Sequence, residues 1–388
     1  MVEQQSWIGA RPTNPQIVAL MTCGVVGLMI PGLQPLLLGA LAEKGRVSAS
    51  SIGFIATAEL LVMGLTAGLA GAVLKSSRLR FIAIVALVVL AVIDALTPLA
   101  HGDMLTLARA AAGIPSGVLV WITISFIART PTPERWAGAY VTAQTLGQFL
   151  MAAAVSAFVA PHASVDGGFV ALALLCVATI AIALLLPTDL APLPKGATAG
   201  LPTARGWSAL AVSFLLLAVT SGVWVYVEQL SRQAHHAASI AGQAVSLSLA
   251  FQVVGGIAAT VLAGRIHWLP ALIGCAIVDA GVFAGFATLP SPPVFIALAC
   301  ALGFVWLFAI PFLVPMTIEA DPTRRAALLI GGAQLIGGSL GPLFVSFFVT
   351  DADARGALAF AATCLTASMV IVIALHATRR LDGARAAS

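Results

Sequence analysis

The stretch "RWAGAYVTAQTLGQFLMAAAVSAFV" (residues 135–159) occurs a second time in altered form, as "RAALLIGGAQLIGGSLGPLFVSFFV" (residues 325–349). The two stretches lie 190 positions apart, and ten of their 25 positions are identical. The identical positions include polar and glycine pairs that chance does not explain: Arg135/Arg325, Gln144/Gln334, Gly147/Gly337 and Ser156/Ser346. At the same shift Gly113 corresponds to Gly303. A repeat over this distance predicts two parallel-related halves.

The composition places those halves in a membrane. Of the 388 residues, 60% are hydrophobic and only 9% are charged, and the mean hydropathy is +1.05. Soluble domains keep about 25% charged residues, so this chain cannot cover a surface that faces water on all sides. Its apolar runs reach the ~20 residues that a membrane-crossing helix needs. They lack the alternation of barrel strands, which predicts an all-α integral membrane protein.

Charge and cysteine content exclude several other classes. The net charge is +4 and the isoelectric point is near 9.0, but the cations are scattered over short loops. We therefore expect no nucleic-acid partner. All five cysteines lie in apolar runs and lack disulfide or metal spacing. No phosphate-binding Gly-x-x-x-x-Gly-Lys loop occurs, and we expect no metal and no cofactor. The polar first sixteen residues and the long run after them predict no cleaved signal peptide.

Breaks at glycine, proline and charge clusters divide the chain into twelve predicted membrane spans. These are 15–41, 49–74, 80–100, 104–128, 136–160, 168–187, 207–230, 239–263, 269–289, 293–318, 325–349 and 356–378. The predicted organisation is an N-terminal six-helix bundle (1–187), a linker (188–206) and a C-terminal six-helix bundle with a short tail (207–388).

The loops predict the orientation. Fourteen Lys and Arg residues fall on the side of the two termini and the linker, and four fall on the other side. The excess of cations marks the cytoplasmic side. We therefore expect both termini in the cytoplasm and a multi-pass protein of the plasma membrane, the inner membrane in a bacterium. We expect the protein to act as a monomer in the lipid bilayer.

Twelve helices, a mid-chain linker and a parallel six-plus-six repeat resemble the major facilitator superfamily. The stretch "LTLARAAAGIPSG" (105–117) looks like the fourth-helix motif of its proton-coupled members, Leu-x-x-x-Arg-x-x-x-Gly, which Leu105, Arg109 and Gly113 match. In the eleventh span "GGSLGP" resembles the antiporter motif Gly-x-x-x-Gly-Pro. The family carries that motif in helix five, where this chain has Met151 and Ala152. The resemblance covers nearly the whole chain and implies secondary transport.

Four ionisable residues lie inside the predicted spans. Each costs about 2.5–3.5 kcal/mol at a helix centre and is therefore a functional candidate. Arg109 is interpreted as a cavity charge that acts on a carboxylate or substrate, with an interfacial snorkelling arginine as the alternative. Glu59 is the expected proton carrier, because its helix neighbours that of Arg109 in the resembling fold, with a structural ion pair as the alternative. Asp279 is the next candidate for proton coupling, against a structural buried acid, whereas Asp94 is interpreted as structural or interfacial.

Aromatic and amide side chains predict the substrate site. Trp121, Trp224 and Trp306 lie deep in spans four, seven and ten, which line the central cavity in the resembling family. The further candidates are Tyr226, Gln34, Gln144 and Gln334. Aromatic walls with a few polar groups suit a small, partly apolar organic solute, although a tryptophan in a span can also be plain packing.

The expected function is secondary active transport by alternating access, as proton-coupled efflux of such a solute by antiport. The alternative is proton-coupled uptake of an organic acid by symport, since Arg109 could pair with a substrate carboxylate. A membrane-embedded enzyme is a remote alternative, because all six histidines lie in loops or at helix ends. A receptor that transports nothing is another, and we expect no enzyme activity.

Overall fold

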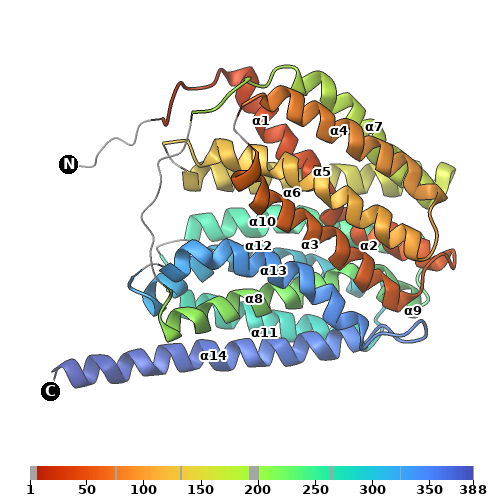
Figure 1. Cartoon of the computed structure of the whole chain (residues 1–388). Helices are drawn as coiled ribbons and strands as arrows, with labels where there is room; N and C mark the ends of the chain where they lie inside the picture. Colours follow the sequence, from red (N-terminus) through yellow and green to blue (C-terminus); the bar gives the residue numbers. More distant parts are fainter. Residues whose placement is uncertain are drawn as a thin grey trace. The chain divides into compact units, whose positions relative to one another are not determined.

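The computed structural model describes residues 7–74, 77–131, 133–191, 201–262, 265–323 and 325–387. Within these ranges the regular structure is helical throughout (Figure 1). The middle of the predicted linker, residues 192–200, lies outside them. The chain divides into two compact units, unit 1 (Met1–Val47 and Ala58–Gly196) and unit 2 (Ser48–Thr57 and Ala197–Ser388). The boundary at residues 196 and 197 falls inside the predicted linker, and the start of one helix groups with unit 2.

The helices of unit 1 are α1 (Asn14–Gly27), α2 (Met29–Glu43), most of α3 (Ala49–Val73), α4 (Leu79–Leu96), α5 (Asp103–Ile127), α6 (Pro133–Ala154) and α7 (Ala160–Ala183). A short 3₁₀ helix, η1 (Thr97–Leu99), follows α4, and a π-helical turn, η2 (Val155–Val159), joins α6 to α7. Helix α4 packs against α5 and α7, and α1 packs against α5.

The helices of unit 2 are α8 (Ala204–Val225), α9 (Val227–Gln233), α10 (Ala238–Leu262), α11 (Trp268–Ala287), α12 (Pro292–Ala320), α13 (Arg325–Ser346) and α14 (Gly356–Ala387). Helix α12 packs against α10 and α11, and α8 packs against α13 and α14 (Figure 1).

In the described part of the chain, twelve helical spans are long and apolar enough to cross a bilayer, which confirms the predicted all-helical fold. Two spans predicted as single helices are divided. The first breaks at Leu28, and the seventh breaks at Tyr226. Pro31 explains the first break, because a proline has no N–H for the carbonyl four residues earlier and its ring crowds that carbonyl. That carbonyl belongs to Gly27, the last residue of α1.

Two side chains of α6 bind backbone carbonyls around the first break. The Gln148 Nε2 atom donates to the Leu28 carbonyl at 2.5 Å, and the Tyr140 hydroxyl donates to the Gly24 carbonyl at 3.0 Å. In a membrane, a backbone carbonyl without a hydrogen-bond donor costs on the order of several kcal/mol. The break in the first span is therefore tied to α6.

The repeat seen in the sequence is also a repeat of packing. A Cβ atom added to Gly113 would lie 2.5 Å from the Glu59 carbonyl oxygen, and one added to Gly303 would lie against the Ser248 carbonyl oxygen and 2.5 Å from Ser248 Oγ. Each glycine thus lets its helix approach the backbone of a helix two spans earlier, α3 in unit 1 and α10 in unit 2. Small residues at such contacts are typical of helix packing in membranes.

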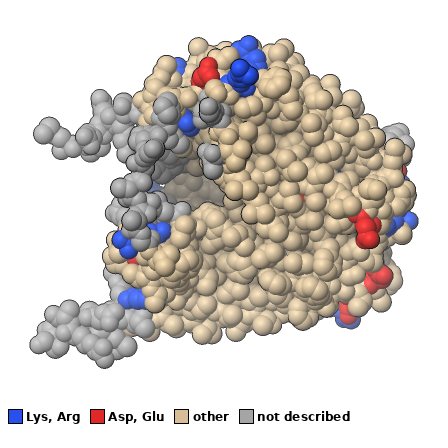
Figure 2. Space-filling view, viewed as in Figure 1, with Lys and Arg blue, Asp and Glu red and all other residues tan. Residues whose placement is uncertain are grey.

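The flanks of the helices are suited to lipid. Large uncharged areas separate the few Lys, Arg, Asp and Glu side chains on the face that Figure 2 shows. Apolar side chains such as Leu69, Phe81 and Leu174 are more than 60% exposed within the chain. An apolar exposed surface of this extent is a membrane-facing surface.

Because Gly113 and Gly303 face backbone and Ser248, their replacement by alanine should overpack both contacts. We expect Gly113→Ala and Gly303→Ala each to destabilise the protein by about 1–3 kcal/mol. Gly274→Ala on α11 is the matched control, because no described atom lies within 4 Å of its added Cβ. Thermal unfolding in detergent, followed by tryptophan fluorescence, measures the difference. An unchanged melting temperature for Gly303→Ala would show that this contact is not tight.

Candidate functional site

A buried cluster of three charged side chains lies inside unit 1. The Arg109 Nη1 atom donates to Asp94 Oδ1 at 2.7 Å, and its Nε atom donates to Glu59 Oε2 at 3.2 Å. The Nη2 atom forms an ion pair with Glu59 Oε1. Helices α3, α4 and α5 thus each contribute one member, and all three nitrogens of the guanidinium bind a carboxylate.

Each member is almost fully removed from the surface of the chain. The exposed fractions are 1% for Arg109, 1% for Glu59 and 3% for Asp94. The ring of Phe169 on α7 covers the guanidinium, with its centroid 5.3 Å from the Arg109 Cζ atom. Arg109 therefore does not extend to an aqueous interface, and the alternative of a snorkelling arginine is wrong. Asp94, interpreted from the sequence as structural or interfacial, is not interfacial.

The turn that ends the α4 span ties the cluster to the loops of unit 1. Arg109 Nη1 also donates to Thr97 Oγ1, at 3.3 Å, on η1. The carbonyls of Pro98 and Ala100 accept from Arg46 Nη2 at 2.6 and 2.7 Å. Arg46 in turn pairs with Asp166 at 2.6 Å. Arg46, partly buried in a loop, therefore holds the η1 turn, and Thr97 of this turn contacts Arg109.

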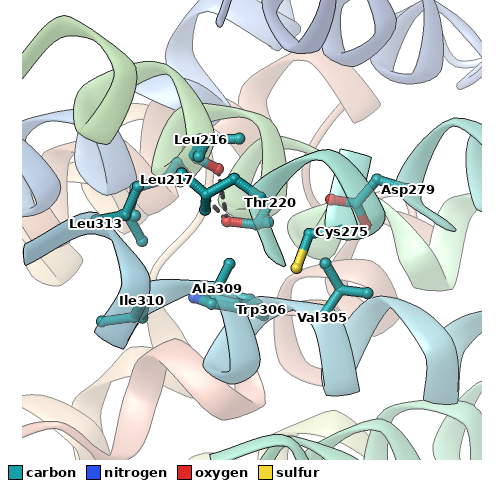
Figure 3. Close-up of a pocket in the computed structure, with 11 residues that line it drawn as sticks. Leu216, Leu217, Thr220, Cys275, Asp279, Val305, Trp306, Ala309, Ile310 and Leu313 are labelled. Carbon is teal, nitrogen blue, oxygen red and sulfur yellow. Dashed lines mark hydrogen bonds between the residues drawn. The ribbon is translucent and has the colours of Figure 1, made fainter. Parts of the chain in front are cut away.

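Unit 2 has a small cavity of about 20 Å³ beside Asp279, between α8, α11 and α12 (Figure 3). Thr220, Cys275 and Trp306 line it together with apolar side chains. Asp279 is 2% exposed, and its Oδ1 atom has no hydrogen-bond partner among the described residues. The cavity is large enough for one water, which needs about 10–15 Å³. The structure thus places Asp279 apart from any described arginine but at the same cavity as Trp306.

The three tryptophans have different surroundings. The rings of Trp224 and Trp306 meet edge to face, with centroids 5.9 Å apart and an angle of 79° between their planes. Such an arrangement is a favourable aromatic contact. Trp121 is 5% exposed and belongs to the apolar core cluster of unit 1. The structure therefore brings two of the predicted aromatic residues together in unit 2.

The remaining candidates divide by burial. Gln34 on α2 is 1% exposed, and its Nε2 atom has no hydrogen-bond partner among the described residues. Tyr226 is fully buried at the break between α8 and α9. Gln144 and Gln334 are partly exposed at corresponding positions of α6 and α13. A buried amide without a partner is a group that a solute or a water can satisfy.

Sequence reasoning missed several residues of these sites. The sequence favours a structural or interfacial role for Asp94 and gives no role to Thr97 or Gln148. Cys275 lies four residues before Asp279, so the helical period alone places both on one face of α11. For Asp94 a weaker signal existed, because it and Thr97 are three residues apart, close to the end of the same span.

The charged cluster has no counterpart at the equivalent positions of unit 2. Ala299 lies 190 positions after Arg109, and α12 contacts Ser248 of α10 where α5 contacts Glu59 of α3. The packing is thus repeated, but the charges belong to unit 1.

Comparison with known proteins places this geometry in a family. A family model of the Major Facilitator Superfamily matches residues 16–346. No curated protein sequence gives a significant match. Among solved structures, the chain is similar to a point mutant of the nucleoside transporter NupG, with a TM-score of 0.72 and 14% identity over 93% of this chain and 99% of that one.

The chain is also similar to a bacterial homologue of the human lysosomal transporter Spinster in an inward-facing, unoccupied conformation. The TM-score is 0.63 and the identity 13%, over 95% of both chains. The same homologue in its occupied state gives a TM-score of 0.62 and 16% identity, over 96% of this chain and 97% of that chain. At such identities the likeness concerns the fold. Because the family model covers most of its length, the chain belongs to the Major Facilitator Superfamily.

Proposed function

We propose that this transporter exports a small, partly apolar organic solute in exchange for protons, and that the cluster of Arg109, Glu59 and Asp94 is its proton-binding site. The buried cluster carries this proposal. Ionisable groups inside a membrane are costly and persist where they serve ion or substrate pathways. The family membership supports transport, and the antiport direction rests on the resemblance of the helix motifs.

The charge balance of the cluster supports proton coupling. One guanidinium and two carboxylates have a net charge of −1 when both acids are ionised, and a single proton brings the cluster to neutrality. The adjoining cavity, lined by Glu59, Asp94 and Arg109, measures about 10 Å³. This is the lower limit of about 10–15 Å³ for one water, so the cavity has no room for a metal cation that keeps its own waters. A proton needs no such space.

The contacts of Arg109 favour efflux over the symport of an organic acid. Its Nε, Nη1 and Nη2 atoms all donate to Glu59 or Asp94. A substrate carboxylate would therefore have to displace one of these acids before it could pair with the guanidinium.

For the solute, we propose aromatic and amide contacts. The apolar faces come from Trp121, Trp224, Trp306 and Tyr226, and the polar groups come from Gln34, Gln144 and Gln334. The Gln34 amide supports this role because it is buried without a described partner. Asp279 is a second candidate for proton binding. The protein acts as a monomer in the plasma membrane, with both termini in the cytoplasm.

Removal of the guanidinium should abolish coupling. Arg109→Met leaves two carboxylates facing each other, which costs about 3–5 kcal/mol for a broken buried pair. We expect flux driven by a pH gradient to fall to the level of empty liposomes. Arg109→Lys keeps the charge but loses the bidentate geometry, and should retain partial flux. Internal pH, reported by pyranine in proteoliposomes, measures proton movement when uridine, phenethylamine or benzoate is added outside.

A triple variant separates coupling from stability. Glu59→Met, Asp94→Leu and Arg109→Met together replace the cluster by apolar side chains, which is often neutral or stabilising. We expect this protein to unfold near the wild-type temperature and to show no proton movement. Full proton movement in the folded triple variant would refute the proposed site. Proton entry together with benzoate beyond that of empty liposomes would instead establish the symport alternative, and no movement with any solute beyond that background would favour a receptor.

Labelling tests the proposed orientation. In a Cys364→Ser background, Glu43→Cys at the end of α2 and Thr188→Cys after α7 place exposed thiols at opposite ends of unit 1. The cation distribution predicts that a membrane-impermeant maleimide labels the thiol at position 43 from outside whole cells, and the thiol at position 188 only after the membrane is opened. The reverse pattern would invert the topology, and labelling of both positions from outside would refute the span count.

Replacement of a ring tests the aromatic contacts. Trp306→Leu should raise the KM of the solute that moves most protons by about three- to tenfold, the equivalent of ~0.5–1.5 kcal/mol for an aromatic contact. Trp136→Leu is the control, because Trp136 packs against Trp7 and Phe126 instead. Equal effects of the two replacements would mean that Trp306 is a packing residue.

A further inference from the structure

The two acids that bind Arg109 are held differently. Both oxygens of Glu59 accept from the guanidinium, Oε2 from Nε and Oε1 from Nη2. Asp94 accepts through Oδ1 alone, and the structure shows no hydrogen bond to its Oδ2 atom from the described residues. Glu59 is therefore bound in the two-pronged manner of an ionised carboxylate, whereas Asp94 has one oxygen to spare.

This difference decides which oxygen can take a proton without the loss of a hydrogen bond to Arg109. On each oxygen of Glu59 the lone pair that faces Arg109 already accepts an N–H, so a hydrogen placed there would face a second donor, and only the outward lone pair is left for a proton. A hydrogen on Asp94 Oδ2 leaves every contact of the guanidinium in place. A protonated carboxyl keeps acceptor capacity on its other oxygen, so Oδ1 continues to accept from Nη1.

Few titratable or charged groups surround Asp94 among the described residues. The titratable and charged groups that face it are Arg109 from α5, Glu59 from α3 and Cys176 from α7. The Thr97 hydroxyl donates to the Ile93 carbonyl at 2.8 Å and accepts from Arg109. Its hydrogen is thus committed to the backbone, and Arg109 is the one cation in this described environment for two acids.

We propose that Asp94 carries the exchangeable proton of the cluster, on Oδ2, while Glu59 stays ionised as the permanent partner of Arg109. This inference rests on the proposed proton coupling and reassigns the proton from Glu59, the carrier that the sequence favours. Protonation changes the net charge of the cluster from −1 to zero without breaking a hydrogen bond. Loss of the proton leaves a net negative charge, which is tolerated when water enters the site.

Charge removal alone cannot identify the acid, because Asp94→Asn and Glu59→Gln each leave one cation and one anion. Isotope-edited infrared spectroscopy does identify it. The purified transporter is made with carbon-13 in the side-chain carboxyl of either aspartate or glutamate, and the carbonyl band of protonated acids is followed as the pH is raised. Asp279 gives its own band, which is recognised by its loss in Asp279→Asn.

In the wild type we expect a titrating carbonyl band that is absent in Asp94→Asn. This band should shift in frequency when aspartate is labelled and should not shift when glutamate is labelled. A band that moves with labelled glutamate would place the proton on Glu59, which overturns this inference and leaves the proposed function standing. If no titrating band is lost in Asp94→Asn or in Glu59→Gln, the cluster binds no exchangeable proton, and both proposals fail.

Flux gives an independent readout. Asp94→Asn should lose pH-gradient-driven flux to the liposome background. Asp94→Glu restores an acid, and should recover part of the flux together with a band that now moves with labelled glutamate. Gradient-driven flux that persists in Asp94→Asn would contradict the assignment.

Discussion

The structure of unit 1 is organised around the need to compensate one buried cation. A guanidinium in the low-dielectric interior of a membrane protein is tolerated only when opposite charge and hydrogen-bond acceptors surround it. Arg109 meets this requirement with Glu59, Asp94 and Thr97, which come from three elements, and with the ring of Phe169 from a fourth. The turn that carries Thr97 is in turn held by Arg46. Helices α3, α4, α5 and α7 are thereby committed to one arrangement.

The repeat shows which features serve the fold and which serve one half. Gly113 and Gly303 make the same kind of contact in both units, so close helix packing is common to them. The charges are not repeated, because Ala299 stands where Arg109 would be. The third membrane span of each half nevertheless carries a buried aspartate, Asp94 on α4 and Asp279 on α11. In unit 1, Asp94 accepts a hydrogen bond from Arg109. In unit 2, Asp279 lines a cavity large enough for one water.

Hydropathy and the breaks in the sequence are enough to predict the twelve spans, because a long apolar run indicates a membrane helix. Pro31 signals the break after Gly27, whereas the break at Tyr226 has no proline within the next four residues and could not be predicted. The contact of Arg109 with Glu59 could be expected because the resembling fold makes their helices neighbours. The contact with Asp94 depends on how far α4 is rotated about its axis, which the spacing of Asp94 and Thr97 alone does not determine.

The central claim, that solute and proton binding are linked through the Arg109 cluster, is tested most directly by counting protons at equilibrium. Purified transporter in a weakly buffered detergent solution with a pH indicator is titrated with the solute that moves most protons in liposomes. Linkage requires that a solute which competes with a proton displaces it, and the charge balance predicts a release of about one proton per chain. The triple apolar variant of the cluster should release none. A wild-type protein that binds this solute without any release of protons would contradict the account.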